Sequence, residues 1–309
     1  ALGGGTGMSS LLRGLKDFPA DITAVITVSD NGSSTGKLRQ EFSIPAIGDI
    51  RKVLTNLSSL PDEVKEIMEY RFHTYSDLNG HPIGNLILTA LLNKTGNLKK
   101  SIEYLSTLLD VKQKVLPLSE DSLTLMGETT DGTIIEGEAN VTEAGKKIKR
   151  VFYKQEPNVL PEVIDAIKEA DLVIISMGSL YTSIMPHLIC KEVVQAVRHT
   201  KGKVMYLCNA MTQPGETDTF TVSDHLEALE KYLGKHTIDV VVASNTKINP
   251  DVLHKYQTTE EKDPVVIDYE QIDDMGIELI EGDLLTTEDG TIRHDSMKLS
   301  SLIFAYLFK

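Results

Sequence analysis

The residues best suited to chemistry lie in short polar loops, and the first of these opens the chain. Residues 2–9 read LGGGTGMS, and an apolar run at helical spacing begins at Met8. Glycine lets a backbone turn tightly and approach a ligand closely, and the unpaired N–H groups at a helix start favour an anion. We therefore expect this loop to bind a phosphate or pyrophosphate. Gly5 and Gly7 match the first two glycines of the dinucleotide fingerprint GxGxxG, but Ser10 replaces the third, so the match is weak.

A second polar loop follows the apolar stretch 22–28. Residues 29–38, SDNGSSTGKL, come close to the P-loop pattern GxxxxGK[ST], but only three residues separate the two glycines and Leu38 replaces the hydroxyl residue that would hold Mg²⁺. We therefore reject an ATPase P-loop. Asp30 ends the predicted strand, where a dinucleotide-binding fold places the acid that holds a ribose hydroxyl. Two alternatives for Asp30 are a metal ligand and an Asx-type turn.

Two further stretches supply a cation, a second acid and a histidine. In PAIGDIR (45–51), Asp49 stands near a predicted helix start, where a carboxylate is favourable even without a metal. Arg51 offers a bidentate fork that would neutralise a phosphate. In NGHPIGN (79–85), His81 is more typical of a structural hydrogen bond than of a catalytic base. The histidines show no metal-like spacing, so we assign no zinc site.

Two more loops follow later apolar stretches. GSLYTSIMP (178–186) and NAMTQPGETD (209–218) carry hydroxyl and amide side chains beside glycines. Such groups recognise a phosphate, a ribose or a base by hydrogen bonding. Neither loop places a nucleophile beside a base, so the sequence does not predict a hydrolase of the GxSxG kind.

These loops alternate with predicted strands and helices. Apolar, β-branched runs are typical of buried parallel strands, and they occupy residues 22–28, 171–177, 203–209 and 238–244. Helical patterns occupy residues 8–17, 48–60, 61–72, 82–96, 97–111, 161–170, 187–198, 222–233 and 294–307. We predict a Rossmann-like, doubly wound α/β fold with a mostly parallel sheet and helices on both faces. In such a fold the loops gather at the carboxyl ends of the strands, where ligands bind.

Residues 113–154 depart from this rhythm. Alternating side chains and an Asp131-Gly132 turn indicate short antiparallel strands. We predict a single α/β domain over residues 1–309 with a β-rich insert at about 113–154. Only Ala1 and Leu2 precede the glycine loop, so we expect the natural start and most of the first strand to be missing.

Composition limits the classes of partner. The chain has 309 residues and a formal net charge of −14, which argues against nucleic acid as a main partner. No apolar run approaches the ~18 residues that span a bilayer, so we expect no membrane association. Cys190 and Cys208 lie in apolar stretches without CxxC spacing, as expected for reduced, buried thiols in a cytoplasmic protein.

The motifs, taken in order, resemble the CofD-like superfamily and, within it, the YvcK-type gluconeogenesis factors of bacteria. The segments that carry the resemblance are GGGTG, DNGSSTG, GDIR, GHPIGN, GSLYTSI and NAMTQPGET, and they extend over most of the chain. The resemblance implies a Rossmann-like fold that binds a UDP-sugar and that is required for cell morphology and cell-wall synthesis on gluconeogenic carbon sources. CofD proper is a 2-phospho-L-lactate transferase that acts on a nucleotide-activated substrate with Mg²⁺.

The resemblance also implies the nucleotide contacts. With the adjoining loop glycines, these are Gly4, Gly5, Thr6, Gly7, Asp30, Asn31, Ser33, Ser34, Arg51, Asn85, Gly178, Ser179, Ser183, Asn209, Thr212 and Gln213. The family loop often reads DDGGS[ST]G, so Asn31 removes one carboxylate and weakens a two-acid metal site. Asp30 and Asp49 remain the candidate Mg²⁺ ligands. We therefore favour a nucleotide-sugar-binding regulator over a transferase.

Other ligands and partners follow from the same resemblance. NAD(P) stays open as a ligand, because a glycine loop accepts any pyrophosphate. The expected partners are the nucleotide sugar, a protein of cell-wall synthesis and further copies of the same chain in a homo-oligomer.

Overall fold

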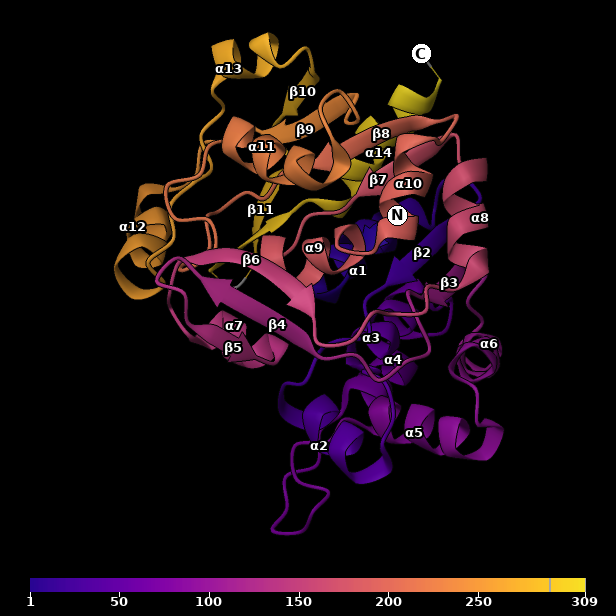
Figure 1. Cartoon of the computed structure of the whole chain (residues 1–309). Helices are drawn as coiled ribbons and strands as arrows, with labels where there is room; N and C mark the ends of the chain where they lie inside the picture. Colours follow the sequence, from indigo (N-terminus) through magenta and orange to yellow (C-terminus); the bar gives the residue numbers. More distant parts are fainter. Residues whose placement is uncertain (289, 309) are drawn as a thin grey trace.

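A seven-stranded parallel sheet forms the centre of the structure, a computed structural model that describes residues 1–288 and 290–308 (Figure 1). Its strands in spatial order are β10 (Glu278–Gly282), β9 (Val240–Ser244), β8 (Lys203–Leu207), β7 (Leu172–Ile175), β1 (Leu2–Gly3), β2 (Thr23–Ile26) and β3 (Lys114–Pro117). The strand order reverses between β1 and β7, because the chain runs outward from β1 through β2 to β3 and then continues with β7 on the other side of β1. Doubly wound folds bind their ligands at this type of switch point, and the predicted fold class is confirmed.

The two faces of the sheet bury separate hydrophobic clusters because side chains alternate along each strand. Val25 points into one cluster, whereas its neighbours Ala24 and Ile26 point into the other. The Val25 face is covered by α8 (Pro161–Glu169), α9 (Met185–Leu188), α10 (Lys191–Arg198), α11 (Val222–Leu233) and α13 (Tyr269–Asp274). The opposite face is covered by α1 (Gly5–Leu15), α3 (Gly48–Leu57), α6 (Leu98–Leu108) and α14 (Ser296–Leu307).

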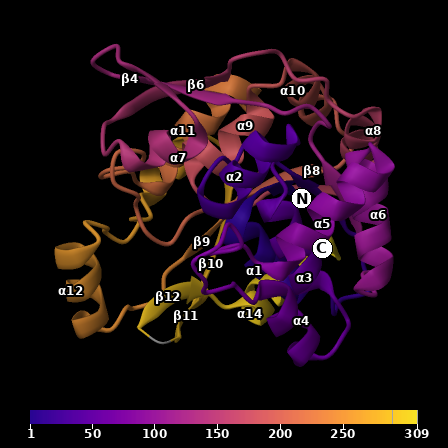
Figure 2. The same ribbon diagram turned by 90° about the horizontal axis from the view of Figure 1, so that it is seen from below.

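Three further helices pack outside this second layer. They are α2 (Ser33–Phe42), α4 (Asp62–Glu69) and α5 (Ile83–Thr95), and α5 touches both of the others as well as α3 and α6. Figure 2 shows α12 (Pro250–Thr259) on the opposite side of the molecule from α6. Within the described ranges, no helix combines the length and apolar character needed to cross a bilayer.

The β-rich insert is smaller than predicted. Its antiparallel sheet has the order β5 (Ile134–Glu136), β4 (Leu125–Thr129), β6 (Ile148–Tyr153), and α7 (Glu138–Glu143) connects two of these strands. The predicted turn at Asp131-Gly132 joins β4 to β5, with Gly132 at φ 83°. The first strand assigned to the insert, β3, instead pairs in parallel with β2 at the edge of the main sheet.

Several elements have no counterpart among the sequence-based predictions. Helix α2 begins at Ser33, inside the stretch expected to be a loop. Strand β10 was not predicted because it lies at the sheet edge and lacks a continuous buried run. The sequence analysis also did not predict α12, α13 or the hairpin of β11 (Leu285–Glu288) and β12 (Thr291–His294).

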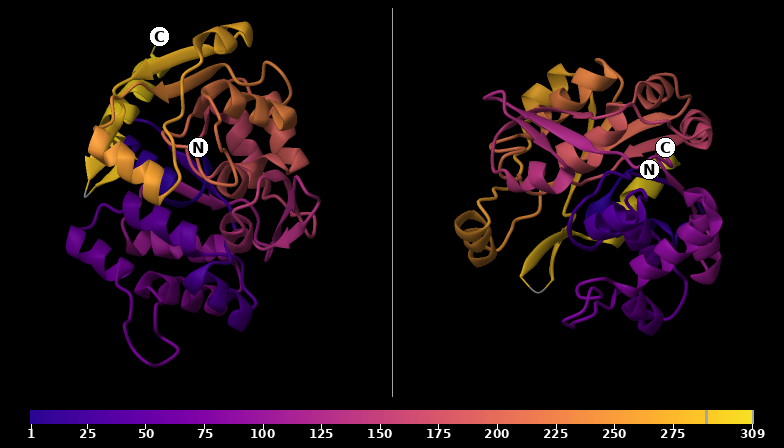
Figure 3. Two further views of the ribbon diagram at one scale, coloured as in Figure 1. Left: turned by 90° about the vertical axis from the view of Figure 1, so that its left-hand side faces the viewer. Right: turned by 60° about the horizontal axis from the view of Figure 1, so that its bottom comes forward.

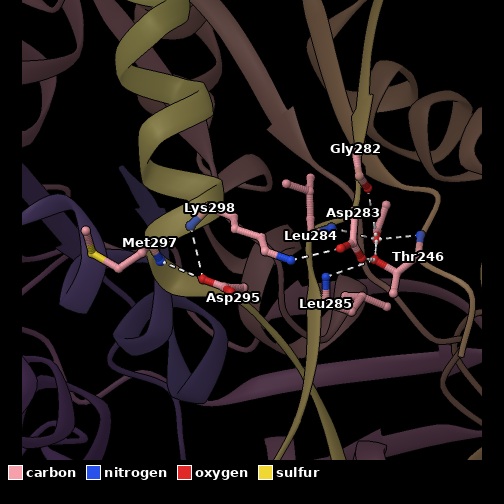
Figure 4. Close-up of polar contacts among 9 residues, drawn as sticks. Thr246, Gly282, Asp283, Leu284, Leu285, Asp295, Met297 and Lys298 are labelled. Atoms are coloured by element: carbon pink, nitrogen blue, oxygen red, sulfur yellow. Dashed lines mark hydrogen bonds and ion pairs between the residues drawn. The ribbon is translucent and has the colours of Figure 1, made fainter. Parts of the chain in front are cut away.

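The hairpin and α14 are tied to the end of β10 by polar contacts (Figure 4). Thr246 Oγ1 donates to Asp283 Oδ1 at 2.7 Å and accepts from the Leu285 amide at 3.0 Å. Lys298 Nζ contacts Asp283 Oδ2 at 2.9 Å. Asp295 caps α14 by accepting from the amides of the following turn. These contacts fix the C-terminal helix against the sheet, where it packs on α1.

Candidate functional site

The predicted loops meet at the carboxyl edge of the sheet around the switch point between β1 and β7. Gly4 follows β1, the segment ending at Asp30 follows β2, Gly178 follows β7 and Asn209 follows β8. Two of these loops are joined directly, because Asn209 Oδ1 accepts from the Gly178 amide at 2.9 Å and Asn209 Nδ2 donates to the Gly178 carbonyl at 2.7 Å. The sequence thus predicted that these loops meet at one edge of the sheet.

The glycine loop is shorter than predicted, because α1 begins at Gly5. Gly5 has φ 62°, a left-handed conformation that favours glycine. Its N–H donates to Asp49 Oδ2 at 2.7 Å. A Cβ on Gly7 would lie 2.1 Å from the Met177 carbonyl oxygen, so this glycine allows α1 to approach the end of β7. Thr6 is exposed to solvent.

Three carboxylates from distant parts of the chain gather beside this loop. Asp30 Oδ1 accepts from the Gly32 amide at 2.8 Å, and Glu138 Oε2 accepts from Ser29 Oγ at 2.9 Å. Burial raises the pKa of Asp30, and the charge of Asp49 raises it further. Burial likewise raises the pKa of Glu138 well above its usual value, with repulsion from Asp30 and then Asp49 added. Sequence reasoning missed Glu138, since the insert carries it to the site.

Asp30 and Asp49 are the two acids that could hold the Mg²⁺ implied by the resemblance. Mg²⁺ at a phosphate site usually relies on one or two carboxylates plus the phosphates. Asp30 and Asp49 fit that requirement, because they lie close enough for the charge of Asp49 to raise the pKa of Asp30. They would hold the cation, which would neutralise charge on a bound phosphate. Among residues 1–288 and 290–308, no group of three His, Cys, Asp or Glu side chains is arranged to hold a metal ion.

Asn31, which replaces the second family acid, connects the loop after β2 to the insert. Its Oδ1 accepts from the Ala139 amide at 2.9 Å, at the start of α7. A Cβ on Gly137 would lie 2.3 Å from Asn31 Nδ2, so the two segments are in close contact. Ser33 is exposed, with φ 41°. In this structure Asn31 therefore stabilises the approach of the insert.

Arg51 and Asn85 belong to a buried chain of polar contacts. Arg51 Nε donates to Asn85 Oδ1 at 3.2 Å, and Asn85 Nδ2 donates to Ser34 Oγ at 3.0 Å. Ser34 Oγ and His81 Nδ1 lie 2.8 Å apart. Arg51 is only 1% exposed and forms an ion pair with Glu69. Three predicted contacts are thus brought together, and His81 makes the structural hydrogen bond expected of it.

Glu216 organises the loops after β7 and β8. It is 3% exposed and accepts from Ser179 Oγ at 2.6 Å, from the Tyr181 amide at 3.0 Å and from Gln213 Nε2 at 2.7 Å. Burial raises its pKa, whereas the hydrogen bonds from Ser179 and Tyr181 lower it. Two predicted ligand contacts, Ser179 and Gln213, are therefore linked through an acid that the sequence analysis did not select. The sequence signal that could have identified Glu216 is its place in the segment PGET, within a predicted loop.

Two further predicted contacts, Ser183 and Thr212, lie in different parts of the edge. Ser183 lies at the glycine loop, because a Cβ on Gly5 would be 4.0 Å from Ser183 Oγ. Thr212 pairs instead with Asp263, donating its amide to the Asp263 carbonyl at 2.7 Å and accepting from the Asp263 amide at 2.9 Å.

Arg39 of α2 was also missed, because α2 was not predicted. Its Nη1 donates to the carbonyls of Ser29 and Asp30 at 2.9 Å each, and its Nη2 donates to the carbonyl of Leu123. This cation therefore holds the backbone that presents Asp30.

Comparisons with known proteins identify the family and the fold. Residues 1–285 match the family model of 2-phospho-L-lactate transferase CofD. The gluconeogenesis factor of Bacillus subtilis is 45% identical over 302 residues, which cover 97% of this chain and 95% of that protein. The putative gluconeogenesis factor of Thermotoga maritima is 41% identical, with 98% and 97% covered. A crystal structure of a Bacillus halodurans protein superposes with a TM-score of 0.95 at 41% identity, over 98% of this chain and 97% of that one.

Proposed function

The chain belongs to the CofD family, and from this premise we propose that it is a gluconeogenesis factor that binds a UDP-sugar at the carboxyl edge of the sheet. The ligand's pyrophosphate lies against the glycine loop and the start of α1. The sugar nucleotide acts as a signal that the protein passes to a partner in cell-wall synthesis, so binding, and not turnover, is the function. The similarity to two named gluconeogenesis factors over nearly the whole chain supports the cellular role.

One observation carries the ligand class. The Gly5 amide already binds an anionic oxygen, since it donates to Asp49 Oδ2 at 2.7 Å. A carboxylate oxygen stands here in the place of the phosphate oxygen to which the same N–H would donate, at the positive end of an 11-residue helix. Ser183 lies beside the same glycine and supplies a hydroxyl.

The mutual bonding of the loops supports recognition over catalysis. Ser179 and Gln213 bind Glu216, and Asn209 binds Gly178, so the polar side chains hold the loops in position before a ligand arrives. Preformed sites lose less entropy on binding. A general base that activates a nucleophile against a bound sugar must lie within hydrogen-bond reach of the proton that it removes. His81, the histidine of these loops, instead contacts Ser34 inside the protein.

A second candidate function is favoured by one observation. Asp30 and Asp49 lie close enough for the charge of Asp49 to raise the pKa of Asp30. Such a pair suits a Mg²⁺-dependent transferase of the CofD type, because a metal and placed cations stabilise charge that develops on phosphate.

Calorimetry with UDP-N-acetylglucosamine distinguishes the two functions. We expect nearly equal affinity in Mg²⁺ and in EDTA, and intact nucleotide by chromatography after long incubation. GDP, ATP and NAD(P) serve as competing ligands that test the base and the pyrophosphate. A strong Mg²⁺ requirement together with release of UDP or UMP would favour the transferase, and no binding of any nucleotide would contradict both.

A further inference from the structure

Strand β10 forms one edge of the main sheet. Among the described residues it pairs with β9 and with no second strand. The Glu278 amide donates to the Asp239 carbonyl at 3.0 Å, so the backbone of Glu278 faces β9. Successive residues of a strand direct their backbone groups to opposite sides, and the backbones of Leu279 and Glu281 therefore face away from β9. Their N–H and C=O groups form an open edge of the kind that pairs with another chain.

A hollow lies between this edge strand and α13, which stand side by side at the upper end of the molecule (Figure 1 and Figure 3). It has a volume of about 510 Å³, and its apolar lining is supplied by Ile272, Ile277 and Leu279. Tyr269 also lines it and donates from Oη to Glu281 Oε2 at 2.8 Å, so its ring is fixed between α13 and β10. A strand laid along β10 would direct every second side chain toward this hollow.

The rim of the hollow is acidic. Glu270 and Asp273 of α13 and Glu278 of β10 line it, and all three are exposed. They belong to residues 263–288, which contain nine Asp and Glu residues and no Lys, Arg or His. Like charges on two identical edges oppose their pairing, so the rim rejects a second copy of β10. The same charges attract a cationic partner.

We propose that β10 accepts an extended, basic segment of another protein as an additional strand. The segment bonds to the outward backbone groups of Leu279 and Glu281. Its Lys or Arg side chains on the α13 side lay their methylene stems over the apolar lining and place their charges at Glu270 and Asp273. Strand addition of this type takes its affinity from main-chain hydrogen bonds and its specificity from alternate side chains.

Fluorescence anisotropy with a labelled, end-capped peptide of alternating Lys and Thr residues tests the proposal. We expect saturable binding to the full chain. A peptide with Glu in place of Lys should not bind. The Lys–Thr peptide with a methylated backbone nitrogen at every second residue keeps its charge but loses strand donors, so it should bind at least about tenfold more weakly. Equal affinity for the methylated peptide overturns the proposal, as does absence of binding by the Lys–Thr peptide.

Variants of the chain separate the edge from its general negative charge. Asp273→Lys should weaken Lys–Thr binding by about tenfold, because a like charge then meets the peptide at the rim. Glu66→Lys makes the same change at an exposed position of α4 and should keep the parental affinity. Glu281→Pro removes an outward N–H, which a sheet edge tolerates, and should abolish binding. Equal losses in Asp273→Lys and Glu66→Lys contradict the proposed edge, and this comparison holds even where Glu281→Pro fails to fold.

Amide hydrogen exchange locates the bound peptide. The amides of Leu279 and Glu281 should exchange faster than the Glu278 amide in the free chain and should slow when the Lys–Thr peptide is added. Protection that appears only at other elements contradicts the placement. The edge is separated from β7 by β8 and β9, and no nucleotide is present in these measurements, so their outcome is independent of the proposed function.

Discussion

The Gly5 amide and the Asp49 carboxylate are held 2.7 Å apart, although 44 residues separate them in sequence. The other carboxylate oxygen of Asp49 contacts Lys52 Nζ at 3.1 Å. Asp49 therefore accepts the hydrogen bond of the amide expected to bind phosphate and also forms an ion pair with Lys52.

Asp49→Ala should strengthen nucleotide binding in the absence of a metal. The change frees the Gly5 amide and Lys52 and removes a negative charge from the phosphate position. We expect about tenfold higher affinity for UDP-N-acetylglucosamine in EDTA, equivalent to about 1.4 kcal/mol. Calorimetry on Asp49→Asn, which keeps an acceptor without the charge, should give an intermediate value. Weaker binding in EDTA would contradict competition, and weaker binding only in Mg²⁺ would identify Asp49 as a metal ligand.

Gly5→Ala should reduce both stability and nucleotide binding. Its φ of 62° is costly for any residue with a Cβ, by about 1–2 kcal/mol. Gly276 has φ 69° and open space around a Cβ, and it lies far from the loops, so Gly276→Ala is a matched control. Urea unfolding should show similar losses for the two variants, with binding weakened only in Gly5→Ala. Parental affinity in Gly5→Ala would mean that the loop is only a turn.

Arg51→Ala should lower the free energy of unfolding by about 1–3 kcal/mol, because it leaves the buried Asn85 Oδ1 without its donor. The variant Glu69→Gln distinguishes the predicted phosphate contact of Arg51 from this structural role. That variant leaves the guanidinium without its carboxylate, so it should raise nucleotide affinity if Arg51 binds phosphate. Unchanged affinity with lowered stability in Glu69→Gln would contradict the phosphate contact.

Glu138→Gln should stabilise the protein at neutral pH. The pKa of Glu138 is raised by burial and by Asp30 and Asp49, so the folded state holds the proton more firmly than the unfolded chain. Its contribution is therefore complete below the unfolded value of about 4.5 and is lost as pH rises through the folded pKa. Glutamine stays neutral and avoids that loss. Urea unfolding should show a gain at neutral pH that disappears in acid.

Glu128 in the same insert provides the opposite case. Hydrogen bonds from Lys149 and then Arg150 lower the pKa of Glu128. Its contribution is thus present above the unfolded pKa and is lost in acid, so Glu128→Gln should destabilise the protein at neutral pH. A gain in both variants would mean that the substitutions act through packing and not through charge.

The sequence was most informative where local pattern decides structure. The runs that became β2, β7, β8 and β9 are apolar because helices cover the sheet on both faces. Strand β10 escaped prediction because its exposed edge position imposes no such run. The start of α2 was read as a loop because glycine and serine are typical of turns, yet the close approach of Gly36 to the Asn31 carbonyl requires glycine within the helix.

The sequence predicted which loops gather at the carboxyl edge of the sheet, but it did not predict the side chains that bond to them there. Gly5, Asp30, Ser179 and Asn209 were assigned to the edge where the structure places them. Their partners could not be derived, since Ser29 and Glu138 lie 109 residues apart and meet only after the insert folds over the loops. Pairings at that separation depend on tertiary packing and leave no periodic signal.

The hydrogen-bonded chain of His81, Ser34 and Asn85 joins two helices. Ser34 lies in the first turn of α2, in the stretch expected to hold nucleotide, and Asn85 belongs to α5. If a bound nucleotide makes local opening of α5 less frequent by some factor, opening of α5 weakens the nucleotide's binding by the same factor, because linkage is reciprocal. Amide exchange in α5 then reports the occupancy of a loop that α5 does not itself form.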